Sequence, residues 1–340
     1  MASARNVRRG LPAVVLCLAA FAAAGPAAGA DRLVVLNKSD DTATILDAST
    51  GRSIATVPVG HGPHEAAILA DGRTCAVSDY GDRARPGRTI TLVDVAKGER
   101  IGSIELPSGA RPHGLQALRD GRLLVTAEGL GELLLVDPKP RHVEWQIPTF
   151  QETSHMVVAT PNGQRAFVAN IGSGSVTVVE GRRAIRQIAT GKGAEGIART
   201  PDGREVWVTN REAETVSVID TAGLESVATI PVAGFPIRVA ITPDGKRALV
   251  SCAKSGDVAV LDVPGRREIR RIPIGNQAVP GREAAKTPTP VGLLVAPDGR
   301  RAWVACTEAD VVVALDLENL TVSGSLTAGR EPDGLAGVFP

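Results

Sequence analysis

Residues 195–231 read EGIARTPDGREVWVTNREAETVSVIDTAGLESVATIP, with short apolar runs separated by turn-forming residues. Pro201-Asp202-Gly203 predicts a tight turn, because proline presets φ and glycine permits a positive φ. Around this turn, apolar and β-branched residues predict four strands, which we name A to D, over 196–200, 205–210, 215–221 and 226–232. The segment is therefore one four-stranded antiparallel unit.

The same unit recurs about every 42 residues. Strand C ends in two apolar residues and an acid in seven places, at Asp47, Asp94, Asp137, Glu180, Asp220, Asp262 and Asp316. The A–B turn recurs six times, at Asp71, Asp120, Asn162, Asp202, Asp244 and Asp298. This repeat predicts an all-β, seven-bladed β-propeller of four-stranded blades. The seventh blade is split, with strand A from Asp333–Val338 and strands B to D from Leu33–Val59, so that both chain ends close the ring.

Two segments carry a resemblance to a known family. Trp207-Val208-Thr209-Asn210 and Phe167-Val168-Ala169-Asn170, together with the Pro-Asp-Gly turns, resemble the YVTN repeat family of bacterial exported seven-bladed β-propellers. The resemblance covers residues 31–340 and implies one propeller domain over that range. Related rings include lactonases, antibiotic lyases and the copper-cluster domain of nitrous oxide reductase. The resemblance therefore implies an architecture rather than one activity.

Residues 1–30 have the pattern of a cleavable signal peptide. Arg5, Arg8 and Arg9 form a basic start, residues 11–24 are apolar, and Ala28-Gly29-Ala30 offers small residues for cleavage. The apolar stretch is too short to span a membrane. We therefore expect cleavage after Ala30 and a periplasmic or secreted protein.

The bulk composition excludes several classes of partner. The formal net charge is +1, and no basic run lies outside the leader, which argues against nucleic-acid and membrane-surface binding. Aromatic residues are only 3%, which argues against stacking platforms for bases or sugars. After cleavage, Cys75, Cys252 and Cys306 remain, an odd number that we expect to be free thiols. We expect a monomer without a membrane span.

Differences between the repeats point to one face of the ring. The D–A and B–C loops share that face, and variation on a rigid scaffold is where function usually lies. Counting seven residues back from each A–B turn gives the axial entrance of strand A: His64, His113, His155, Glu195, Ile237 and Val291, with Asp333 equivalent in the split blade. The next position includes Glu65 and Arg238. Blades related by about 51° bring such side chains together.

Three interpretations of this cluster remain open. The first is a metal site of His64, His113, His155 and Glu195, a donor set that suits zinc, copper, iron or manganese. The second is a metal-free pocket in which the histidines, Glu195 and Arg238 bind an anionic ligand. In the third, these residues only fill the mouth with polar groups.

The functional hypotheses follow from this cluster. We favour an exported protein that binds a metal, a small molecule or a protein at the mouth. The alternative is a metal-dependent lactonase, hydrolase or lyase, for which Glu65, Glu195 and Arg238 are catalytic candidates. A protein-interaction scaffold is the third possibility.

The ends of the B strands supply supporting candidates. Counting eight residues forward from each A–B turn gives Asn37, Asp79, Glu128, Asn170, Asn210, Cys252 and Cys306. Asp79 and Glu128 belong to the blades of His64 and His113 and are placed to orient those rings, as is Asp333. The alternative is that such residues only bond to their own turn backbone. Two insertions, 80–88 and 275–290, lie on the same face, as a lid, a docking element or a surface excursion.

Overall fold

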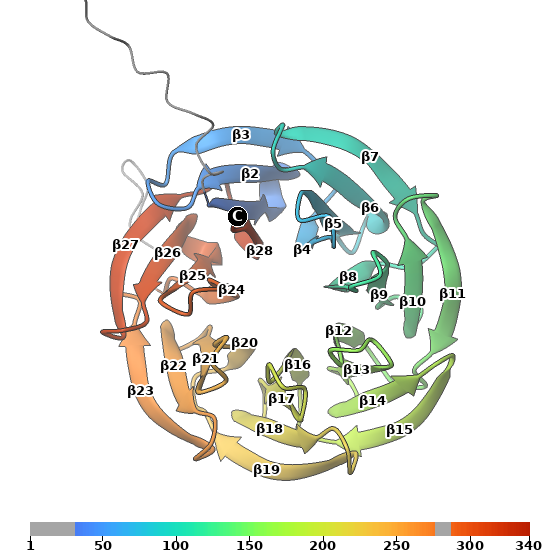
Figure 1. The fold of residues 1–340 in the computed structure, drawn as a ribbon, viewed down its shortest axis with the longest axis vertical. Coiled ribbons are helices and arrows are strands. Elements are labelled where there is room, and N and C mark those ends of the chain that lie inside the picture. The colour runs from blue at the N-terminus through green and yellow to red at the C-terminus, as the bar shows by residue number, and fades with distance from the viewer. Residues whose placement is uncertain (1–30, 276–286) are drawn as a thin grey trace, which may run out of the picture.

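The computed structural model describes residues 31–275 and 287–340. They form a ring of seven four-stranded sheets around one axis (Figure 1). The predicted seven-bladed, all-β propeller is thus confirmed. The expected signal peptide and most of the 275–290 insertion lie outside the described residues.

Each blade is an antiparallel sheet whose innermost strand is strand A. Blade 1 is β4 (Pro63–Ile68), β5 (Thr74–Gly81), β6 (Pro86–Asp94) and β7 (Glu99–Glu105); blade 2 is β8 (Pro112–Ala117), β9 (Leu123–Ala127), β10 (Glu132–Asp137) and β11 (His142–Pro148). Blade 3 is β12 (Ser154–Ala159), β13 (Arg165–Asn170), β14 (Ser175–Glu180) and β15 (Arg183–Ala189); blade 4 is β16 (Ala194–Arg199), β17 (Glu205–Asn210), β18 (Thr215–Asp220) and β19 (Glu225–Pro231). Blade 5 is β20 (Pro236–Ile241), β21 (Arg247–Cys252), β22 (Asp257–Asp262) and β23 (Arg267–Pro273); blade 6 is β24 (Pro290–Val295), β25 (Arg301–Cys306), β26 (Val311–Asp316) and β27 (Thr321–Thr327).

Blade 7 closes the ring with both ends of the chain. Its order is β28 (Pro332–Val338), β1 (Arg32–Asn37), β2 (Thr42–Asp47) and β3 (Ser53–Pro58). The C-terminal β28 pairs antiparallel with the N-terminal β1, with Ala336 opposite Val34. Figure 1 shows the C-terminus beside β28 in this blade. The predicted split blade is therefore confirmed, and it leaves no open seam in the ring.

The hydrophobic core lies between neighbouring sheets. Trp207 of blade 4 packs with Val250 and Leu261 of blade 5, and Trp303 of blade 6 packs with Leu33 of blade 7. The three cysteines of the described residues are buried and free, as expected. Two single-turn 3₁₀ helices connect consecutive strands, Lys38–Asp40 between β1 and β2 and Thr307–Ala309 between β25 and β26. No helix among the described residues is long and apolar enough to cross a membrane.

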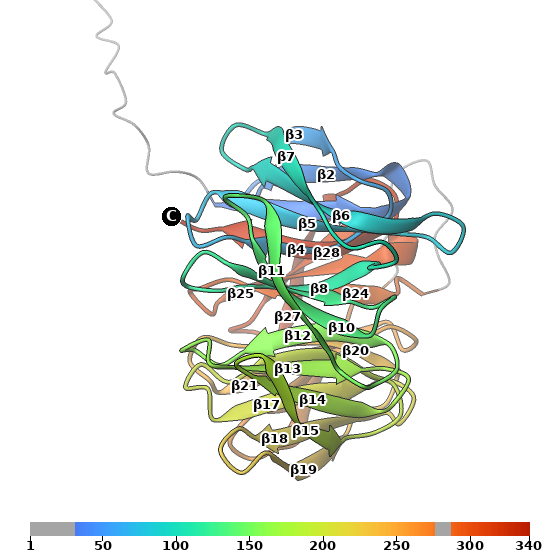
Figure 2. The ribbon, with the colours of Figure 1, turned by 90° about the vertical axis from the view of Figure 1, so that its right-hand side faces the viewer.

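Every A strand carries a β-bulge at the same place. In blade 2, Pro112 pairs with Ala127, but Leu115 pairs with Val125, so strand A has one extra residue. The extra residue falls at 64–65, 113–114, 155, 195–196, 237–238, 291–292 and 333–334. Bulges re-aim side chains and often adjoin active sites. The strands run between two loop-bearing faces (Figure 2), and the bulges lie near the face of the D–A and B–C loops.

Glycines in four of these bulges allow neighbouring A strands to approach closely. A Cβ placed on Gly114, Gly196, Gly292 or Gly334 would lie 2.7, 2.3, 1.9 or 2.4 Å from a carbonyl oxygen of the next blade. Those oxygens belong to His155, Ile237, Asp333 and His64, respectively. Close backbone approach therefore explains the glycines and holds the axial residues of adjacent blades in contact.

Replacing Gly292 by alanine should destabilise the ring. The new methyl group would sit 1.9 Å from the Asp333 carbonyl oxygen, so blades 6 and 7 must separate, at a cost of about 1–3 kcal/mol. Gly324 is the matched control, because nothing lies within 4 Å of a Cβ there. Urea denaturation should show a lower midpoint for Gly292→Ala than for Gly324→Ala. Equal midpoints would contradict the close-approach explanation.

Candidate functional site

Three histidines at equivalent places lie ring beside ring along the mouth of the propeller. His64, His113 and His155 start the neighbouring strands β4, β8 and β12. The ring centroids of His64 and His113 are 4.2 Å apart, and those of His113 and His155 are 3.6 Å apart, with tilts of 51° and 32°. We call these three residues the histidine column. Counting blade against blade thus brings together residues that are far apart in the chain.

The middle ring of the column is completely buried and has no hydrogen-bond partner. His113 is 0% exposed, and neither its Nδ1 nor its Nε2 is hydrogen-bonded. Burial, reinforced by nearby cations, lowers the pKa of His113 well below its usual value. Burial likewise lowers the pKa of His64 to about 3. Both rings are therefore neutral at physiological pH, which is the form that coordinates metals.

His155 differs because two carboxylates hold it. Its Nδ1 is hydrogen-bonded to Glu128 Oε2 at 2.7 Å, and its Nε2 lies 3.6 Å from Glu195 Oε1. Burial alone would lower the pKa of His155, but these two carboxylates outweigh burial and raise it. The column therefore combines two neutral rings with one that attracts a proton.

Tyr80 is a site residue that the sequence did not suggest. Its hydroxyl donates a hydrogen bond to Glu128 Oε1 at 2.5 Å. Its ring meets His64 and His113 edge-on, with centroids 5.2 Å away in each case. Tyr80 lies in the 80–88 insertion, where Gly81 still pairs with Pro86, so this segment is a lengthened hairpin rather than a loop. The insertion thus carries an aromatic side chain to the column.

The structure corrects the position of Glu128. Pro112 pairs with Ala127, as Pro63 pairs with Asp79, so Ala127 holds the strand-end place predicted for Glu128. The A–B turn of blade 2 is one residue shorter, because Leu118 N bonds to Arg122 O, whereas Leu69 N of blade 1 bonds to Thr74 O, and this shifted the count by one. Glu128 consequently lies just beyond the strand and orients His155 of the next blade rather than His113.

Asp79 also differs from its predicted role. Its carboxylate accepts hydrogen bonds from Gly60 N and from the hydroxyls of Thr89 and Thr91, at 2.9, 2.5 and 2.8 Å. Burial raises the pKa of Asp79 to about 6. Asp79 therefore stabilises its own blade through these hydrogen bonds rather than orienting His64. Asn210 likewise donates to Thr215 and Ser217 of the adjacent strand, so strand-end residues act locally.

Arg238 reaches across the axis from blade 5. Its Nη2 contacts Glu65 Oε1 of blade 1 at 2.5 Å, and its Nη1 contacts Glu195 Oε1 of blade 4 at 3.3 Å. Glu195 Oε2 also contacts Arg211 Nη1 at 2.7 Å. Burial alone would raise the pKa of Glu195, but His155, Arg238 and Arg211 lower it to about 2. Glu195 is thus a fully ionised, weak base, and Arg238 is already neutralised.

Asp333 completes the cluster from the C-terminal strand. It is buried, and its Oδ2 lies 3.0 Å from His64 Nδ1, without hydrogen-bond geometry. Lys38 Nζ lies 3.9 Å from the same oxygen. Burial raises the pKa of Asp333. The closing blade therefore contributes a carboxyl group next to the histidine column, where Asp333 was predicted.

The donor atoms divide into two overlapping groups. Within each group the ligand atoms lie within 4.8 Å of one another: His64, Glu65 and His113 form one, and His113, Glu128 and His155 form the other. His113 is common to both. Glu195, predicted as the fourth ligand, is in neither group. The cluster therefore offers two alternative sets of two nitrogens and one carboxylate.

The neutral rings make folding sensitive to acid. Unfolded His64 binds a proton below about pH 6.5, whereas folded His64 does so only near pH 3. The free energy of unfolding therefore decreases as the pH is lowered from 6.5 towards 3. We expect His64→Gln to reduce this slope by about 1 kcal/mol per pH unit. Urea titrations in chelator between pH 7 and pH 5 measure it, with exposed His142→Gln as the control. Identical slopes for wild type and His64→Gln would contradict the neutral ring.

Comparisons with known proteins agree with the fold. The model of a family described as YNCE-like beta-propeller matches residues 118–281. No curated protein matches. A functionally unknown protein of Desulfotomaculum acetoxidans is similar, with TM-score 0.75 and 13% identity over 91% of this chain and 99% of that one.

Two solved structures with named activities are also similar. The periplasmic gluconolactonase PpgL of Pseudomonas aeruginosa has TM-score 0.71 and 19% identity over 91% of this chain and 99% of that one. Hydrazine synthase of Kuenenia stuttgartiensis has TM-score 0.67 and 19% identity over 80% of this chain and 88% of that one. Identities this low establish a shared β-propeller fold, and neighbours on that fold differ in function.

Proposed function

We propose that this chain is an exported binding propeller that holds a divalent transition-metal ion at the histidine column. The observation that carries the proposal is His113, a completely buried ring with two unpaired nitrogens at the junction of two donor groups. A buried polar group without a partner costs about 1–3 kcal/mol, which a metal–nitrogen bond would offset. Nitrogen and carboxylate donors suit zinc, copper, iron or manganese.

The surrounding residues support such a site. His113 would be a ligand in either group, with His64 and Glu65 or with Glu128 and His155. A bound metal would supply a Lewis acid at the mouth. Glu128 orients His155, and Tyr80 in turn holds Glu128, which is the arrangement of outer partners that metal-binding histidines usually have.

Binding is favoured over the alternatives. A metal-free anion pocket needs a cation, but Arg238 is already paired with Glu65 and Glu195. A lactonase, hydrolase or lyase needs a general base, but Glu65 is paired with Arg238, and Glu195, with a pKa of about 2, is a poor base at neutral pH. The likeness to a gluconolactonase adds only the fold. A protein-interaction scaffold does not explain the buried histidine column.

Elemental analysis tests the proposal. Protein prepared from a periplasmic extract should begin at Asp31, if export follows the predicted leader, and should contain about one metal ion per chain. Reloading after chelation with zinc, copper, iron or manganese, one at a time, identifies the preferred ion. Failure to retain any of these ions would exclude the metal site. If an ion is retained, turnover of a panel of lactones would shift the conclusion from binder to enzyme.

A further inference from the structure

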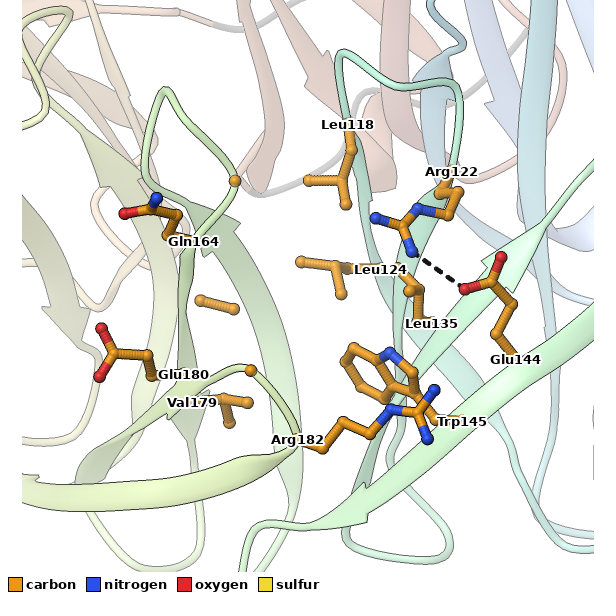
Figure 3. A pocket seen from close by; sticks show the side chains of 13 residues that line it. Leu118, Arg122, Leu124, Leu135, Glu144, Trp145, Gln164, Val179, Glu180 and Arg182 are labelled. Atoms are coloured by element: carbon orange, nitrogen blue, oxygen red, sulfur yellow. Dashed lines mark hydrogen bonds and ion pairs between the residues drawn. The ribbon is translucent and has the colours of Figure 1, made fainter.

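A second candidate site lies on the opposite face, between blades 2 and 3. A cleft of about 620 Å³ opens there, where the A–B and C–D turns of blade 3 meet blade 2 (Figure 3). The apolar part of its wall comes from Leu124 and Leu135 of blade 2 and from Ala166 and Val179 of blade 3. The indole of Trp145, from the outer strand β11, lines it as well. The volume is in the range of small-molecule pockets.

The tryptophan of blade 2 lies on a different strand from those of blades 4 and 6. Trp207 and Trp303 lie on the second strands of blades 4 and 6 and are 0% and 1% exposed. Leu124 holds the equivalent place in blade 2, opposite Leu135. Trp145 lies opposite Leu135 on the outer side, where blades 4 and 6 have Ala228 and Gly324. The indole of blade 2 thus lies two strands farther out, where it lines the same cleft as Leu124.

Blades 3 and 5 each place an alanine at this position of the neighbouring sheet. Trp207 packs against Ala248 of the next blade, and Leu124 packs against Ala166 of blade 3. A leucine cannot fill the space that an indole fills above an alanine. Leu249 and Ala302 repeat this combination between blades 5 and 6, but the outer residue there is Arg270, so Trp145 is what distinguishes the interface between blades 2 and 3.

One unpaired cation lies at the mouth of the cleft. Arg122 is paired with Glu144 at 3.0 Å, and Glu180 is paired with Arg165 at 2.9 Å. Arg182 is exposed and forms no ion pair with any residue that the structure describes. Its side chain extends toward Trp145 in Figure 3. The cleft therefore joins an apolar, indole-lined wall to a free guanidinium.

We propose that this cleft binds a small aromatic anion, with its ring against Trp145 and its acidic group on Arg182. Offset or edge-on packing on an indole favours an aromatic ring over an aliphatic chain. A planar guanidinium pairs with a carboxylate or sulfonate through two parallel hydrogen bonds. The site is separate from the histidine column and does not depend on metal.

Two fluorescent probes that differ by one charge test the proposal. 1-Anilinonaphthalene-8-sulfonate carries a sulfonate, whereas N-phenyl-1-naphthylamine has the same rings without it. We expect saturable binding of the sulfonate probe at one site, weakened about fivefold or more by Arg182→Gln. The adjacent Arg183→Gln is the matched control, because Arg183 does not line the cleft. The uncharged probe should bind wild type and Arg182→Gln equally.

Two further variants locate the bound ring. Ala166→Leu fills the cleft and should abolish binding of both probes, and Trp145→Ala should weaken both, while circular dichroism confirms that the variants are folded. His113→Ala should leave probe binding unchanged, so failure of the metal site does not affect this test. Sulfonate-probe binding that is insensitive to Arg182→Gln, or that survives in folded Ala166→Leu, would overturn the proposal.

Discussion

Replacing His113 by alanine is expected to weaken metal binding by more than about 100-fold, since a ligand contributes at least as much as an outer partner. The effect should exceed that of changing His64 or His155, because His113 belongs to both donor groups and each of the others to only one. Competition with a chromophoric chelator measures the affinity. His142→Ala removes an exposed histidine elsewhere and should not change it.

The folding of the His113 variants needs its own control. The side chain is completely buried, so alanine leaves a cavity. His113→Gln keeps most of the volume and should lose metal to the same extent while its circular dichroism matches wild type. Wild-type affinity in both variants would show that the column is a packing feature.

Replacing Glu65 by alanine should cause the largest loss of stability. Arg238 is buried at the axis, and Glu65 is one of its two carboxylate partners. Breaking a buried ion pair on one side costs about 3–5 kcal/mol, because it leaves a poorly compensated charge. Thermal unfolding in the presence of chelator should reveal a clear drop in Tm, independent of metal.

A double variant separates lost charge from lost volume. Glu65→Leu combined with Arg238→Met removes both charges and should recover part of the stability lost in Glu65→Ala, because Glu195 loses Arg238 but keeps its contact with Arg211. Glu105→Ala breaks the exposed pair with Arg88 and should change Tm little. If Glu65→Ala behaves like Glu105→Ala, the pair across the axis is not a structural element.

Residues at equivalent positions of the repeats could be predicted from the sequence, whereas features confined to one blade could not. The recurring acid and Asp-Gly positions sufficed to number the blades and to align His64, His113 and His155, because equivalent positions share one radius and one height. Glu128 was misplaced because the count assumed A–B turns of equal length, and the turn of blade 2 is one residue shorter. Counting a fixed number of residues from each A–B turn cannot detect such a change.

Tyr80 and the pairing of Arg238 with Glu65 could not be predicted by aligning the blades, although Arg238 and Glu65 themselves align at one axial position. Tyr80 reaches the column from a hairpin extension found in one blade, so no other blade offers a comparison. Arg238 and Glu65 are 173 positions apart and meet only across the axis. The β-bulges that orient these side chains are only partly visible in the sequence, as glycines in four of them: Gly114, Gly196, Gly292 and Gly334. Close packing of the A strands, rather than any local motif, determines the site.

Pairing of β28 with β1 determines when Asp333 can join the histidine column during folding. Asp333 lies next to His64 only because β28 has paired with β1, so ring closure and completion of the cluster are one step. A nascent chain that lacks its last nine residues has neither. The two donor groups of the histidine column come entirely from blades 1 to 3, so ring closure adds the Asp333 carboxyl group beside His64 without supplying any of those donors.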